Sequence, residues 1–229
     1  MVEGHKMEQV IAFILGWLAS FSASVVYALG VRPNIDIHIE DDQQQLTATF
    51  PTGIKYRVIH LLVENKRADF LWRWYTERQT AWGCEVVLEV LFANDNTKRA
   101  LPDKIIARWS STSEPTVTLF GGGSINGQPI PRAVYDKSKL PYGRRFDLHG
   151  NMQEKIDLII KNSGEQECYI LSNESYQFPY LNNPKWKLDK GNYLVTVQAQ
   201  SGRIKKQKTF KISNDGIKLE DVIIEVYNP

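Results

Sequence analysis

Three side chains that could hold a metal alternate along one short segment near the N-terminus. Asp36, His38 and Glu40 share one face of a predicted strand, because side chains two residues apart point the same way. Carboxylate and imidazole groups are common metal ligands. A site also needs further ligands from elsewhere in the chain, and the sequence names none. We therefore interpret this set as a solvated strand face, and we expect no metal and no cofactor.

The motifs of known catalytic sites are missing from the sequence. The run Gly121–Ser124 (GGGS) lacks the helix and the Lys-Ser/Thr pair of phosphate-binding loops. There is no G-x-S-x-G, H-E-x-x-H or Cys–His motif, and His60 sits in an alternating strand where we expect it packed or at an edge. Serine–histidine–aspartate triads are recognised by geometry, so a missing motif does not decide the question. We predict a protein that is not an enzyme, with a membrane-bound metal-dependent hydrolase as the alternative.

An insert rich in aromatic and arginine residues is a candidate contact surface. Such residues concentrate in protein interfaces, and they also suit a membrane surface. The alternative is a short cap on the domain with its aromatic rings buried. The candidate contact residues are Trp72, Arg73, Trp74, Tyr75, Arg78 and Trp82.

A second charged segment lies near the C-terminus and contains Arg203, Lys205, Lys206, Lys208 and Lys211. A basic strand of this kind is typical of a solvated sheet edge, where charge discourages pairing with other chains. It could also contact anionic lipid or an acidic partner.

Composition places the chain among ordinary folded proteins. Of its 229 residues, 42% are hydrophobic and 24% are charged, with a formal net charge of +2. A charge this small gives no electrostatic case for nucleic-acid binding. Cys84 and Cys168 could form a disulfide outside the cytoplasm or stay free and buried inside it, and the sequence leaves both open.

The segment from Val10 to Val31 contains no charged residue. As a helix it would be about 33 Å long, which matches the hydrocarbon thickness of a bilayer. Arg32 and Pro33 end it, because proline cannot continue the helix. We therefore predict a single-pass membrane helix within a first region, 1–32. The alternatives are a cleaved signal peptide and, less favoured, a buried helix of a soluble protein.

Small residues recur every four positions along this helix, at Ala12, Gly16, Ser20, Ser24 and Ala28. Such a ridge lets two helices approach closely, which would support a homo-oligomer or packing against another membrane protein. Small residues are also common in membrane helices, so composition alone could produce the pattern. The basic residues near the two ends nearly balance, so the side of the membrane that holds the domain is undetermined.

After Pro33 the apolar pattern changes to a two-residue period, which predicts strands. No amphipathic helix separates them, so we predict an antiparallel β-sandwich over 33–229, with a long loop-rich excursion at 93–146 and strands inside it near Ile105 to Trp109 and Val117 to Phe120. The other predicted strands are Ile35 to Ile39, Leu46 to Phe50, Lys55 to Val63, Cys84 to Phe92, Lys155 to Asn162, Glu167 to Leu171, Asn192 to Ala199, Lys208 to Ile212 and Val222 to Tyr227.

Several segments carry a family resemblance: the apolar N-terminus, RPNIDIHIE, YRVIHLLVENK, AWGCEVVLEVL, ARWSSTSEP and GNYLVTVQA. In this order they resemble uncharacterised prokaryotic membrane-anchored proteins with an immunoglobulin-like β-sandwich domain. The resemblance implies that fold and an anchor, but no activity. Basic residues after the helix would hold such a domain in the cytoplasm, yet here only Arg32 stands there. The chain also departs from the pattern in its insert between Asn65 and Ala81.

These features together predict a membrane-anchored binding or scaffold protein. The lipid bilayer is its first expected partner, and a protein of unknown identity is the second. An accessory subunit of a membrane complex, assembled through the helix, is an alternative function that rests on the small-residue ridge.

Overall fold

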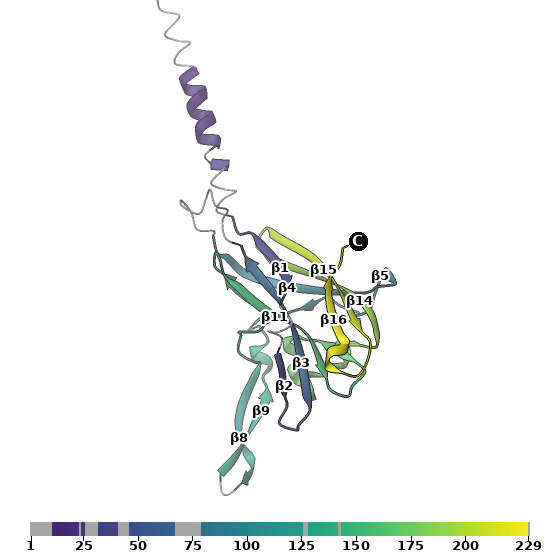
Figure 1. Ribbon diagram of the computed structural model, residues 1–229. Coiled ribbons are helices and arrows are strands. Elements are labelled where there is room, and N and C mark those ends of the chain that lie inside the picture. Colours follow the sequence, from purple (N-terminus) through teal and green to yellow (C-terminus); the bar gives the residue numbers. More distant parts are fainter. Residues whose placement is uncertain are drawn as a thin grey trace, which may run out of the picture.

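Alternating apolar and polar residues form long strands through most of this chain, which is mainly β. The computed structural model describes residues 11–22, 24–25, 32–40, 46–66, 79–125, 128–141 and 143–228. In this part of the chain two antiparallel sheets pack on a shared core, and a third, two-stranded sheet stands apart (Figure 1).

The first sheet has the order β1-β3-β11-β12-β13, with β2 paired to β3 and β7 paired to β11. Every pairing in it is antiparallel, and the register shifts between Asp157 and Ile159. Its strands are β1 (Ile35–Ile39), β2 (Leu46–Thr49), β3 (Lys55–Asn65), β7 (Arg108–Trp109), β11 (Gln153–Asn162), β12 (Cys168–Ile170) and β13 (Lys187–Leu188).

The second sheet has the order β10-β4-β14-β15-β16, with β5 and β6 paired to β4. Its strands are β4 (Ala81–Phe92), β5 (Asp95–Arg99), β6 (Ile105–Ile106), β10 (Arg145–Leu148), β14 (Gly191–Ser201), β15 (Ile204–Asn214) and β16 (Val222–Val226). The basic residues 205–211 lie on β15, which pairs with β14 and β16. β16 pairs only with Phe210–Asn214, so among the described residues Lys205, Lys206 and Lys208 lie on an open edge of the sheet, as expected, whereas Lys211 is covered by β16.

The core follows from the two-residue period. On β3 the side chains of Ile59, Leu61 and Val63 are buried between the sheets, and Val86 and Leu88 on β4 meet them from the other side. The intervening residues of β3 face away from this core. On that outer face a second, smaller apolar cluster forms around Val58, Ile160, Tyr169 and Leu171.

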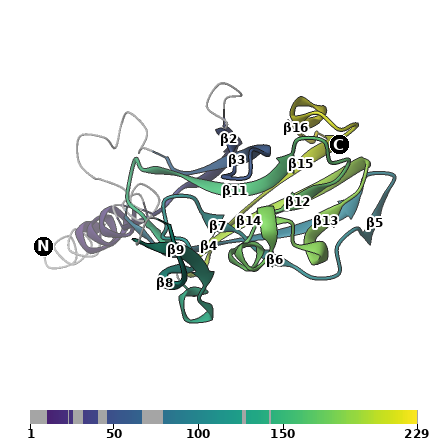
Figure 2. The same ribbon diagram turned by 90° about the horizontal axis from the view of Figure 1, so that it is seen from below.

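The excursion at 93–146 holds more strand than the sequence suggests. β6, β7 and β8 lie where strands are expected, but β8 (Thr116–Ile125) and β9 (Gln128–Tyr135) also form a long hairpin, the arm. It leaves the domain beside β7 (Figure 2). Its strands pair only with each other in the described residues, so Pro129 and Pro131 interrupt no central ladder.

Five short 3-10 turns occur among the described residues, and Leu181 from one of them packs on the outer apolar cluster of the first sheet. Three of them follow one another after β12: η3 (Asn173–Gln177), η4 (Pro179–Leu181) and η5 (Pro184–Trp186). The other two are η2 (Lys137–Lys139), after the arm, and η6 (Leu219–Asp221), before β16.

Near the N-terminus, residues 11–22 and 24–25 are helical, and Figure 1 shows this helix outside the two sheets. Within the described part of the chain, no helix combines the length and apolar character needed to cross a bilayer. The predicted span also includes residues 10, 23 and 26–31, which lie outside the described residues.

The two cysteines lie on different sheets, Cys84 on β4 and Cys168 on β12, and both are free and fully buried. Burial raises the pKa of each thiol to about 12. Buried thiols of this kind act as small apolar side chains and are inert.

Candidate functional site

A pocket of about 870 Å³ opens on the outer face of the first sheet. Its floor is formed by β3, β7 and β11, and its walls by the Phe50–Ile54 turn, the 3-10 segment after β12 and the root of the arm. The sequence folds this way locally because Val58 and His60 alternate with the core residues of β3 and so face outward. The outer face is thus the place where buried polar groups and a cavity occur together.

Four polar residues from three elements meet on the pocket floor. Ser110 Oγ donates a 2.6 Å hydrogen bond to Asp157 Oδ1, and His60 Nδ1 lies 3.1 Å from the same oxygen. Arg108 Nε lies 3.6 Å from Asp157 Oδ2. Arg108 also donates to the Thr112 hydroxyl at 3.2 Å and to the Thr112 carbonyl. Asp157 is therefore the centre of a network that joins β3, β7 and β11.

The charged groups of this network are largely buried. The side chains of Arg108, His60 and Asp157 are 3%, 8% and 12% exposed. A buried guanidinium and a buried carboxylate need each other, because a lone charge in the interior is strongly destabilising. The positive charge of Arg108 is thus balanced by Asp157 and is not free to bind an anion.

Serine, histidine and aspartate lie together here, but not in the order of a catalytic triad. In a triad the two ring nitrogens of histidine separate the serine from the carboxylate. Here Ser110 Oγ lies 3.4 Å from His60 Nδ1, the same nitrogen that faces Asp157. Ser110 gives its hydrogen bond to Asp157, so the arrangement orients groups and does not activate a nucleophile.

Aromatic rings form the wall of the pocket. Phe50 stacks on Tyr56 with ring centroids 4.2 Å apart, and Tyr180 meets Phe50 edge-on at 5.3 Å. Tyr176 lies under the Arg108 guanidinium, 5.2 Å from ring centroid to Cζ. Burial raises the pKa of Tyr176, so its hydroxyl stays protonated at neutral pH.

The rim is closed by residues from the arm. Tyr135 at the end of β9 lines the pocket and accepts a 3.2 Å hydrogen bond from Gln177 Nε2. Glu114 also lines the pocket, and together with burial it raises the pKa of Tyr56. The pocket thus combines aromatic rings with fixed polar and charged groups, a lining that suits an aromatic group carrying a polar atom.

The acidic strand face predicted from Asp36, His38 and Glu40 does not gather into one site. Asp36 pairs with Lys66 at 2.5 Å, and the buried Glu40 pairs with Lys155. Among the residues described by the structure, no three histidine, cysteine or acidic side chains form a group that could hold a metal ion.

The predicted contact surface is described at one position only. Trp82, at the start of β4, is 67% exposed. The other five members, Trp72, Arg73, Trp74, Tyr75 and Arg78, lie outside the described residues.

The small-residue ridge is described at four of its five positions, because Ala28 lies outside the described residues. Ala12, Gly16, Ser20 and Ser24 are all exposed on the helix. The Ser24 hydroxyl donates to the Ser20 carbonyl at 2.8 Å, so its hydrogen bond is satisfied within the helix.

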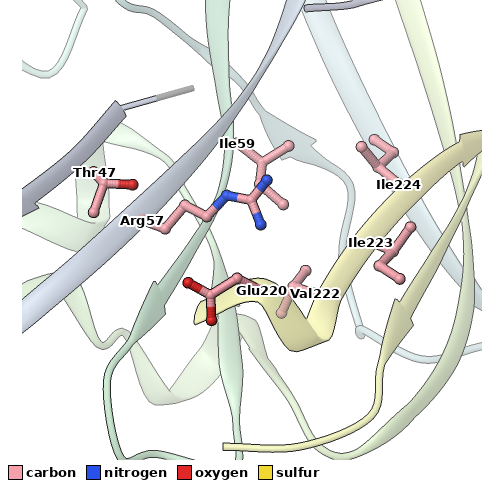
Figure 3. A pocket seen from close by; sticks show the side chains of 7 residues that line it. All are labelled: Thr47, Arg57, Ile59, Glu220, Val222, Ile223 and Ile224. Carbon is pink, nitrogen blue, oxygen red and sulfur yellow. The ribbon is translucent and has the colours of Figure 1, made fainter. Parts of the chain in front are cut away.

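A second cavity of about 500 Å³ lies where the two sheets part between β3 and β16 (Figure 3). Ile59 and Val222 are core residues at its base, and Arg57 reaches across it to donate a 3.4 Å hydrogen bond to the Leu219 carbonyl. This contact ties β3 to η6, and we interpret the groove as the open side of the sandwich.

Comparisons with protein-family models, curated proteins and solved structures give no match. The pocket is therefore identified as a candidate site from its geometry alone. One sequence signal could have pointed to it: Asp157 is a charged residue within the apolar strand KIDLIIKN, where a carboxylate needs a buried partner.

Proposed function

We propose that this chain is a membrane-anchored binding protein, without catalytic activity, whose β domain takes a protein partner at the aromatic pocket. The observation that carries the proposal is the pocket itself: aromatic walls over a fixed network of Arg108, Asp157, His60 and Ser110. Pockets of this kind accept the buried aromatic side chains that dominate protein interfaces.

The arm supports a protein partner over a free small molecule. An isolated two-stranded hairpin is marginally stable in water, and this one stands beside the pocket with Tyr135 at its root. A partner that seats a side chain in the pocket would also reach the arm. The immunoglobulin-like class of the sandwich and the membrane span of residues 10–31 are parts of the same proposal.

The pocket is tested with indole and p-cresol, which mimic tryptophan and tyrosine side chains. We expect saturation-transfer NMR to detect both binding to the full chain in detergent. Ser113→Trp fills the rim of the pocket and should abolish binding. Ser111→Trp is the matched control, since Ser111 is equally exposed but does not line the pocket. Binding that survives Ser113→Trp would count against the pocket.

The anchor is tested by removing residues 1–32. We expect the full chain to sediment with membranes and the truncated chain to stay in the supernatant as a folded domain. A truncated chain that remains in the membrane fraction, or that aggregates, would contradict the proposed anchor.

A second candidate, a hydrolase, is favoured by one observation. His60 Nδ1 faces Asp157, and no partner of His60 Nε2 is found among the described residues. A carboxylate-bound imidazole with one free nitrogen can act as a general base. If this function holds, His60→Gln abolishes hydrolysis of p-nitrophenyl esters while the melting temperature stays near that of the parent. Ester hydrolysis unchanged by this substitution removes the candidate.

A further inference from the structure

One end of the domain gathers segments that are far apart in the sequence. Asn65, the last residue of β3, bonds through its side chain to the Asn34 amide and to the carbonyls of Gln79 and Leu148. Ser201, the last residue of β14, donates a 2.8 Å hydrogen bond to the Trp82 carbonyl. We call this region the helix-proximal end, because the chain enters the domain here from the N-terminal helix (Figure 1).

Trp82 is the aromatic residue of this end. Trp82 is 67% exposed, and its ring meets the His149 ring edge-on, at 6.2 Å between centroids. The His149 ring is held in turn by Thr80, 2.9 Å from its Nδ1. A tryptophan fixed in this way and exposed to solvent suits the headgroup layer of a bilayer, where tryptophan is enriched.

Basic residues lie beside it, Arg203 on the β14–β15 turn and Lys205 and Lys206 at the start of β15. Arg203, Lys205 and Lys206 are exposed, and no acidic partner of these three is found in the described part of the chain. The acidic groups nearby are engaged elsewhere: Glu85 pairs with Arg145 at 3.7 Å, and Asp147 accepts from the Gly83 amide at 2.6 Å. Residues 203–206 therefore present positive charge that no acidic side chain of the described residues neutralises.

The geometry of the chain limits how far this end can stand from a membrane. The first residue of β1, Ile35, lies only four positions after Val31, the end of the predicted span. Even fully extended, this stretch reaches only about 14 Å. The helix-proximal end would therefore lie close to the headgroups, within or near the Debye length of about 8–10 Å over which surface charge acts.

We propose that the helix-proximal end is a contact surface for anionic phospholipid headgroups, with Trp82 as the interfacial ring and Arg203, Lys205 and Lys206 as the charges. This surface rests on the proposed anchor, and it adds a preferred orientation of the domain on the bilayer. The hydrogen bond between Ser201 and the Trp82 carbonyl joins the exposed tryptophan and the basic strand into one surface.

The experiment uses the full chain reconstituted in liposomes of phosphatidylcholine alone or mixed with phosphatidylserine. A fluorophore is attached at Arg203→Cys, which leaves Lys205 and Lys206 as the charges under test, and the buried Cys84 and Cys168 remain unlabelled in the native state. Headgroup spin-labelled lipid reports contact by quenching. We expect stronger quenching with phosphatidylserine, and weaker quenching in high salt.

The variants Lys205→Gln and Lys206→Gln should each lower the contact equilibrium about fivefold, the factor expected for one basic residue near an anionic surface. Trp82→Ser should weaken quenching in both lipid mixtures. The control label at Ile217→Cys, exposed on the β15–β16 turn at the opposite end of β15, should be quenched in neither.

Flotation of the same samples separates the two proposals. A chain that fails to float with liposomes overturns the anchor. A chain that floats, but whose label at position 203 is quenched equally in both lipid mixtures or in neither, overturns the headgroup contact and leaves the anchor standing.

Discussion

Removal of the Asp157 carboxylate is the sharpest test of the pocket floor. In Asp157→Ala, Arg108 loses its only described ion-pair partner while it remains 3% exposed. Ser110 loses the acceptor of its 2.6 Å hydrogen bond, and His60 loses the oxygen 3.1 Å from its Nδ1. The substitution thus leaves the buried Arg108 charge, the buried His60 ring and the partly buried Ser110 hydroxyl without their partner.

The size of the effect follows from the stranded guanidinium. Removing one partner of a buried ion pair lowers the free energy of unfolding by about 3–5 kcal/mol. The total free energy of unfolding of a folded domain is about 5–15 kcal/mol. At about 2–4 °C per kcal/mol for 150–250 residues, the melting temperature should fall by about 6–20 °C.

The assay is urea unfolding of the detergent-solubilised full chain, followed by tryptophan fluorescence. The control is Asp103→Asn, which breaks the exposed pair between Asp103 and Lys185, 3.0 Å apart with side chains 59% and 49% exposed. That change should lower the free energy of unfolding by no more than about 1 kcal/mol.

A double-mutant cycle then assigns the loss to the pair. Arg108→Met removes the charge that Asp157→Ala strands, so the double variant should be more stable than the sum of the single losses predicts, by about 1–3 kcal/mol. Additive losses, or a loss below about 1 kcal/mol in Asp157→Ala alone, would refute the claim that the network is a coupled, buried ion pair.

Three other predictions follow from backbone geometry and thiol burial. Gly143→Ala should lower the free energy of unfolding by about 1–3 kcal/mol more than Gly164→Ala, as measured by urea unfolding. Both glycines have φ near +84°, but only at Gly143 would an added Cβ collide with Thr112. Cys84 and Cys168 should resist maleimide at pH 8 and react after denaturation, by mass spectrometry. Because burial raises both thiol pKa values from 9.0 to about 12, the folded state keeps protons that the unfolded chain loses, so melting temperatures should fall as pH rises from about 9 to 12.

The strands were predictable because their pattern is local. Segments such as Cys84–Phe92 and Lys155–Asn162 carry a two-residue period or an apolar run, and the structure places β4 and β11 there. The arm is only partly predicted, through the expected strand near Val117 to Phe120; β9 is missed because Pro129 and Pro131 argue against a strand in any sheet interior. The prolines are tolerated in the structure because β8 and β9 pair only with each other among the described residues and are not part of a larger sheet.

The pocket could not be predicted, because its members become neighbours only through sheet order. His60 on β3 and Asp157 on β11 meet because these strands pair directly, in the register His60 opposite Asp157. Arg108 joins them because β7 pairs with β11, in the register Arg108 opposite Asp157. The spacing of these residues along the sequence does not predict either strand register. Each of them is nevertheless a polar residue within an apolar strand, which is unusual.

The register of β3 also connects the pocket with the proposed membrane surface. Asn65 ends this strand at the helix-proximal end, and His60 and Tyr56 lie five and nine residues before it. At about 3.4 Å per residue, the pocket begins about 17 Å from that end and extends to about 30 Å. A headgroup layer is only about 5–8 Å thick on each side of a bilayer. A domain that rests on its helix-proximal end would thus hold the pocket and the arm clear of the lipid, where a protein partner can reach them.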